Sequence, residues 1–136
     1  MKDRIYVDSN IWLYAFMKGN SEKTEKAKTI IREPGLILST QVINELCTNL
    51  IKKANYSELE IQQAVKSLYS YYQVITIDKN IIIEASKIRL DYLLSYWDSL
   101  IVSSAILSEC SVLYSEDMQH NQKIQNTKII NPFFVE

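Results

Sequence analysis

The chain has 136 residues, of which 47% are hydrophobic and 23% are charged, and its formal net charge at pH 7 is −1. This length fits one domain, which we predict to span residues 1–136, and the hydrophobic fraction is enough for a sizeable core and excludes a disordered chain. The near-neutral charge gives no basic footprint of the kind that usually marks nucleic-acid binding, although acids gathered in a site would mask a basic rim.

In the first half of the chain, strand signals alternate with helix signals. A short buried strand is predicted over Arg4–Asp8. Asp8 and the next two residues, Ser9 and Asn10, are of types that also cap helices well. Apolar spacing then predicts a helix over 11–17, and the cap Ser21 begins a second helix that runs to about Arg32. A strand over 36–38 and a helix over 41–54 follow. A capping box of Ser57 and Glu60 begins the next helix, which runs to about Tyr72.

The second half continues the alternation. We expect a strand over 74–77, a helix over 79–94 capped by Asp78, and strands over 112–114 and 128–130. From Leu100 to Leu107 nearly every residue is apolar or small, which indicates a buried helix with Asp98 in its first turn. The polar segment 119–126 contains the only histidine, His120, which we expect to be exposed.

Strand and helix signals recur at intervals of roughly thirty residues, as in βαβ units. We therefore predict an α/β protein: a single-domain, three-layer α/β/α fold around a mainly parallel, roughly five-stranded sheet.

The cysteines and the apolar runs bear on the compartment. Cys47 and Cys110 lie among apolar neighbours in helical patterns, so we expect buried, reduced thiols. The first residues, Met1 to Arg4, contain no apolar signal-peptide core, and no apolar run approaches the length of a membrane span. These features favour a cytoplasmic protein without membrane contact.

Four acidic residues share one position relative to the predicted sheet. Asp8 and Asp117 each follow a strand, Glu45 lies about one turn into the helix after the second strand, and Asp98 begins the buried helix. In a parallel sheet all four converge on one edge, where ligands bind. Like charges so close need cations or protons among them, and oxygen ligands without His or Cys indicate Mg²⁺ or Mn²⁺. Such ions can activate a water and hold a phosphodiester in line.

Five segments together resemble one family over essentially the whole chain. They are Asp8-Ser9-Asn10, the Ser39–Glu45 segment, Tyr96–Val102, Ser115–Met118 and the closing Ile130-Asn131-Pro132-Phe133. In this order and spacing they resemble a PIN-domain ribonuclease, of the small kind that serves as the VapC toxin of toxin–antitoxin pairs. The resemblance implies a PIN-like fold and metal-dependent hydrolysis of RNA.

The resemblance also implies roles for individual residues. Asp8, Glu45, Asp98 and Asp117 would bind Mg²⁺ or Mn²⁺ and carry the catalysis, and Asn10 and Ser115 would orient a carboxylate or a water. Glu116 is an alternative to Asp117, and Asn121 stands where the family often has a glycine. The implied partners are a small antitoxin protein and a second copy of the chain, for which apolar and aromatic surface such as Trp12, Tyr69 and Tyr72 would be available.

Two other functions stay open at this point. A phosphoacceptor signalling domain would use Asp78 as the acceptor, but it needs a pair of acids after the first strand, where Ser9 and Asn10 stand. A non-catalytic interaction domain would keep the fold but not the chemistry, and the presence of all four acids argues against it. A dinucleotide-binding enzyme is disfavoured because its glycine fingerprint is absent.

Overall fold

The computed structural model describes residues 3–135, so Met1, Lys2 and Glu136 of the predicted domain lie outside the described residues. Its centre is a six-stranded sheet in the order β3-β2-β1-β4-β6-β5. All neighbouring strands are parallel except β5 and β6, which are antiparallel. The strands are β1 (Ile5–Val7), β2 (Leu36–Ser39), β3 (Gln73–Ile75), β4 (Val112–Tyr114), β5 (Lys123–Ile124) and β6 (Thr127–Ile130).

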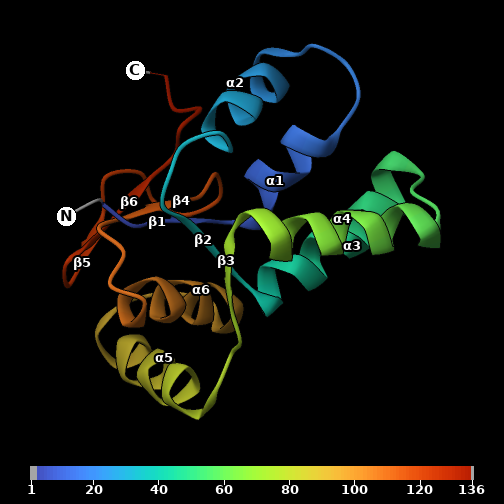
Figure 1. Ribbon diagram of the computed structural model, residues 1–136. Helices are drawn as coiled ribbons and strands as arrows, with labels where there is room; N and C mark the ends of the chain where they lie inside the picture. The colour runs from blue at the N-terminus through green and yellow to red at the C-terminus, as the bar shows by residue number, and fades with distance from the viewer. Residues whose placement is uncertain (1–2, 136) are drawn as a thin grey trace.

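Six helices cover this sheet. Figure 1 shows α1 and α2 on one side, α5 and α6 paired on the opposite side, and α3 and α4 running side by side. This arrangement confirms the predicted mainly parallel α/β fold. The helices are α1 (Ser9–Phe16), α2 (Glu22–Ile30), α3 (Thr40–Ala54), α4 (Glu58–Tyr71), α5 (Lys79–Asp91) and α6 (Tyr96–Leu107). None of the helices within residues 3–135 is long and apolar enough to cross a membrane.

Capping side chains begin the helices where the sequence predicts them. Ser21, Ser39 and Asp78 each accept a hydrogen bond from a backbone N–H in the first turn of the helix that follows, and Ser57 forms a full capping box with Glu60. The last helix, α6, begins at Tyr96 because Ser95 caps it, four residues before the apolar run at Leu100. This earlier start places Asp98 at the third helical position.

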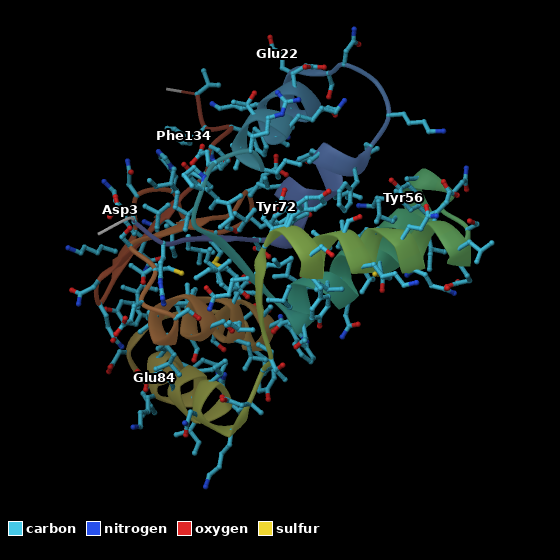
Figure 2. All side chains as sticks on the ribbon, in the orientation of Figure 1. Asp3, Glu22, Tyr56, Tyr72, Glu84 and Phe134 are labelled. Atoms are coloured by element: carbon cyan, nitrogen blue, oxygen red, sulfur yellow. The ribbon has the colours of Figure 1, made fainter. Side chains whose placement is uncertain are left out.

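Aromatic side chains join the helices on one face of the sheet. Trp12 is completely buried, its Nε1 donates to the Val7 carbonyl at 2.9 Å, and its ring meets Tyr72 edge-on with centroids 4.7 Å apart. The Tyr72 hydroxyl donates to the carbonyl of Ile31 at 2.8 Å, and Figure 2 labels this side chain near the middle of the molecule. The expectation that Trp12 contributes to the surface is therefore wrong, and Tyr72 is half-buried, whereas Tyr69 is exposed.

The segment 119–126 differs from its prediction as a purely polar stretch. It contains β5, which pairs with β6 and makes the sheet six-stranded instead of roughly five-stranded. His120 is half-buried and not exposed, because its Nδ1 accepts a hydrogen bond from the Asn131 amide at 3.0 Å and its ring stacks on Phe134. Asn121 has a φ of 69°, the left-handed conformation that asparagine tolerates.

The two cysteines are free thiols, as expected. Cys110 is buried as predicted, whereas Cys47 is only half-buried. Burial raises the pKa of the Cys110 thiol to about 12 and also raises the pKa of Cys47, so neither forms the reactive thiolate readily.

Candidate functional site

The candidate site lies where the parallel strands β1, β2 and β4 end. β1 pairs with β2 on one side and with β4 on the other, and Val7 is opposite Tyr114. The Asp8 amide donates to the Tyr114 carbonyl at 2.9 Å, which continues the pairing by one residue. Side chains that follow these three strands therefore come together at one edge of the sheet, as predicted for a parallel arrangement.

Asp8 is the most enclosed acid of the site, with an exposed fraction of 8%. Its Oδ1 accepts from the Ser9 amide at 2.7 Å, and its Oδ2 accepts from the Ser115 hydroxyl at 3.0 Å. Asp8 is also the N-cap of α1, so the capping interpretation and the site interpretation apply to the same side chain. The hydroxyl of Ser115, which is itself fully buried, fixes the carboxylate from the side of β4.

Ser9 connects Asp8 with Glu45. The Ser9 hydroxyl donates to Glu45 Oε2 at 2.9 Å, and Gln41, one turn earlier on α3, donates from Nε2 to Glu45 Oε1 at 3.0 Å. Glu45 is half-buried and held at both oxygens. The sequence predicts for Ser9 only a candidate capping role and a place in the Asp8-Ser9-Asn10 motif, and it predicts no role for Gln41. The i, i+4 spacing of Gln41 and Glu45 was the available signal for Gln41.

The other two acids are more open to solvent than Asp8. Asp117 is exposed, and its Oδ2 accepts from Asn10 Nδ2 at 2.7 Å. Asp98 is half-buried, and its backbone amide donates to the Ser95 hydroxyl at 3.1 Å. Among the candidate residues, Asn10 and Ser115 therefore each donate to one of the acids, in line with an orienting role.

Glu116 points away from Asp117 in the same turn. It accepts hydrogen bonds from the Tyr14 hydroxyl at 2.7 Å and from the Lys23 ammonium group of α2, with which it forms an ion pair. Although partial burial acts to raise it, the pKa of Glu116 is lowered because Lys23 and Tyr14 donate to the carboxylate. This charge is already compensated, which leaves Asp117 as the acid of this turn that faces the site.

Asp78, the acceptor that a phosphoacceptor domain would use, has a different environment. Its side chain accepts from the Ile81 amide at 3.0 Å and caps α5. It follows β3, the strand at the edge of the sheet, and not β1 or β4.

The pKa values of Asp8 and Asp98 are raised, partly by the charges of neighbouring acids. The pKa of Asp8 is raised to about 7, first by burial and then by the charges of Glu45 and Asp98, while the hydrogen bonds from Ser9 and Ser115 act to lower it. The pKa of Asp98 is also raised, first by burial and then by the charges of Asp117 and Glu45. Each acid is therefore within electrostatic reach of at least one other.

The donor atoms of this site fit a hard divalent cation. All four acids offer carboxylate oxygens, the ligand type that Mg²⁺ and Mn²⁺ prefer. Within residues 3–135, no three Asp, Glu, His or Cys side chains are grouped tightly enough to hold a metal ion directly. Mg²⁺ suits such spacing, because it keeps several waters and usually takes only one or two carboxylates from a protein.

Comparison with protein families gives one match that covers most of the chain. The PIN domain family matches residues 5–123. A search of curated proteins found no match.

Solved structures share the fold at low sequence identity. A toxin–antitoxin complex from Klebsiella pneumoniae is 20% identical, with a TM-score of 0.73, covering 96% of this chain and 99% of that one. VapC20 from Mycobacterium tuberculosis, described as a sarcin-ricin loop cleaving toxin, is 17% identical, with a TM-score of 0.68 and coverage of 83% and 89%. VapBC2 from Rickettsia felis, bound to a promoter DNA fragment, is 18% identical, with a TM-score of 0.66 and coverage of 92% and 96%.

The burial of Asp8 leads to a prediction about stability in the presence of chelator. The folded protein keeps the Asp8 proton up to about pH 7, whereas the unfolded chain releases it near pH 4, so the free energy of unfolding should fall as the pH rises between these values. At about 1.4 kcal/mol per pH unit, Asp8 accounts for up to about 4 kcal/mol of this loss. Asp8→Asn should remove this contribution, because the amide can still accept from Ser9 and can donate to the Ser115 hydroxyl.

Urea unfolding at pH 5 and pH 8 in chelator measures this slope. The control is Asp91→Asn, which changes an exposed carboxylate at the end of α5. If Asp8→Asn and wild type lose the same free energy between the two pH values, Asp8 does not carry the shifted pKa.

Proposed function

The chain belongs to the PIN domain family, and on this premise we propose that it is an endoribonuclease that hydrolyses RNA phosphodiester bonds with water and requires Mg²⁺ or Mn²⁺. The observation that most supports this proposal is the convergence of Asp8, Glu45 and Asp98, from three separate elements, to within electrostatic reach of one another. We further propose that residues 1–136 form one nuclease domain.

In this proposal, Asp8, Glu45, Asp98 and Asp117 are the metal-binding and catalytic residues. A bound divalent ion lowers the pKa of a water and neutralises charge on the phosphate. The chain's own residues hold three of the acids in place, since Ser9 and Gln41 fix Glu45, Ser115 fixes Asp8, and Asn10 fixes Asp117. Because the Asp8 pKa is near 7, cation binding competes with a proton at that carboxylate near neutral pH.

We propose that the protein is the toxin of a type II toxin–antitoxin pair. Support comes from solved structures of the same fold, among them the toxin VapC20 and the toxin–antitoxin complex from Klebsiella pneumoniae. The expected partner is a small antitoxin protein. An extended segment of such a partner that carries a basic side chain would complement the acids electrostatically and block access of RNA.

A homodimer is the second proposed assembly. Leu90 of α5 is 85% exposed and Leu93, just after this helix, is fully exposed, which leaves apolar surface that residues 3–135 do not cover. Light scattering should give about twice the monomer mass of 15.8 kDa. Leu90→Lys should shift the protein towards the monomer, whereas Leu59→Lys, which changes another exposed leucine on α4, should not. A monomer at high concentration would contradict this assembly.

Cleavage of RNA by the purified protein tests the proposed activity. With Mn²⁺ or Mg²⁺ the wild type should cut RNA, and chelator should stop the reaction. Asp98→Asn should lower the rate at least about 100-fold, the scale seen when one group that stabilises transition-state charge is removed. Its circular dichroism spectrum should stay unchanged, because asparagine keeps the shape.

Thermal melts give a readout of metal binding that does not depend on activity. Mn²⁺ at about a hundred times its dissociation constant should stabilise wild type by about 2.7 kcal/mol, or roughly 5 °C, and Asp98→Asn by less. If Asp98→Asn cuts RNA and responds to Mn²⁺ as wild type does, Asp98 is not in a metal site.

Glu116 and Asp117 form a matched pair for a second test. Asp117→Asn should abolish cleavage, because this carboxylate faces the site. Glu116→Gln should keep activity within a few-fold, because its partners are Tyr14 and Lys23 and not the other acids. Single-turnover rates at saturating Mn²⁺ measure both variants. The reverse order of effects would exchange the roles assigned to the two residues.

A further inference from the structure

A pocket of about 580 Å³ adjoins the carboxylates and plays no part in the function proposed so far. Its walls come from the first turns of α3, from Ile77 in the loop after β3, and from the first turns of α6. Glu45 belongs both to this wall and to the group of acids, since it is bonded to Ser9 beside Asp8. The pocket and the acids are therefore continuous.

The side chains of the pocket combine an aromatic ring with amides. Trp97 is 61% exposed, although it lies beside an apolar wall that includes Ile77 and the buried Leu100. Gln41 and Asn44 bring amide groups, which donate and accept hydrogen bonds. Proteins bind single nucleobases by stacking an aromatic ring on the face of the base and by hydrogen-bonding amide groups to the edge of the base.

Gln41 supplies a second, independent observation. Its Nε2 donates to Glu45 and, at 3.3 Å, to the Trp97 carbonyl, which fixes the orientation of the amide. Its Oε1 is buried and has no hydrogen-bond partner among the described residues. A buried acceptor without a partner costs free energy, and an amino group on a ligand in the pocket would satisfy it after a small movement of the side chain.

We propose that this pocket binds one unpaired nucleobase of the RNA, next to the phosphodiester that the acids act on. The inference rests on the proposed ribonuclease function. A nucleotide joins its base and its phosphate through one ribose, so a base beside Trp97 and a phosphate beside the acids can be held at once on the two sides of Glu45. A base within a duplex is stacked and paired and cannot enter, so the protein prefers single-stranded RNA.

Tryptophan fluorescence reads this pocket directly. The chain has two tryptophans, of which Trp12 is completely buried and Trp97 is exposed, so a change of emission on binding reports on Trp97. The probe is a short single-stranded RNA added to Asp98→Asn in Mg²⁺, with the same sequence as a duplex for comparison. The single strand should quench Trp97 and the duplex should not.

Cleavage kinetics of two variants complete the experiment. Loss of one stacked base should lower kcat/KM of Trp97→Ala about 5- to 150-fold, the equivalent of about 1–3 kcal/mol for base–aromatic stacking. The control is Tyr69→Ala on α4, which removes a ring of similar exposure outside the pocket and should keep the wild-type rate. Asn44→Ala should change the relative rates on poly(A), poly(C), poly(G) and poly(U).

The outcomes separate this inference from the proposed function. If wild type cuts RNA while Trp97→Ala cuts equally well and Trp97 is not quenched, the base pocket is overturned and the nuclease stands. RNA that quenches Trp97 but is never cut supports the pocket and overturns the nuclease. If RNA neither quenches Trp97 nor is cut, both the base pocket and the nuclease are overturned. Emission that changes on dilution without RNA means that a second copy covers Trp97, which also overturns the inference.

Discussion

Parallel pairing of β1 on both of its edges is the interaction on which the candidate site depends. Because β2 and β4 run in the same direction as β1, the segments that follow these strands leave the sheet at the same edge. The Asp8 carboxylate is then within reach of the Ser115 hydroxyl, although 107 positions separate the two residues in the chain. Glu45 and Asp98 are placed by α3 and α6, whereas Asp117 lies in the bend after β4.

The same enclosure makes Asp8 costly to ionise. A buried carboxylate has lost water, and the hydrogen bonds from Ser9 and Ser115 replace only part of that solvation. The fold thus holds an acid whose environment favours the neutral form next to other acids that add repulsion. The ion pair of Glu116 with Lys23 compensates the charge of Glu116, so that this carboxylate adds little to the repulsion among the acids of the site. An arrangement of this kind is stabilised by any ligand that brings positive charge, which gives the acids a physical reason to select cations.

The alternation of strands and helices, the capping residues and the order of the acids along the chain were all predictable, because period and capping are local properties. The directions in which side chains point could not be predicted as well from the sequence. Only the family resemblance favoured Asp117 over Glu116, because the directions of the two side chains depend on Asn10 and Lys23, far away in the chain. The two-residue strand β5 is too short to show a period, and Trp12 was expected near the surface because burial of its ring depends on the distant Tyr72.

The ends of the sheet have a consequence for contacts between molecules. An exposed strand edge is a template on which another chain can add a strand, and long, flat edges promote aggregation. Here the two outermost strands are β3, with three residues, and the antiparallel β5, with two. Edge strands this short offer few free backbone N–H and C=O groups to an incoming strand. The short edge strands therefore disfavour contact between copies through continuation of the sheet, and they favour contact through side chains.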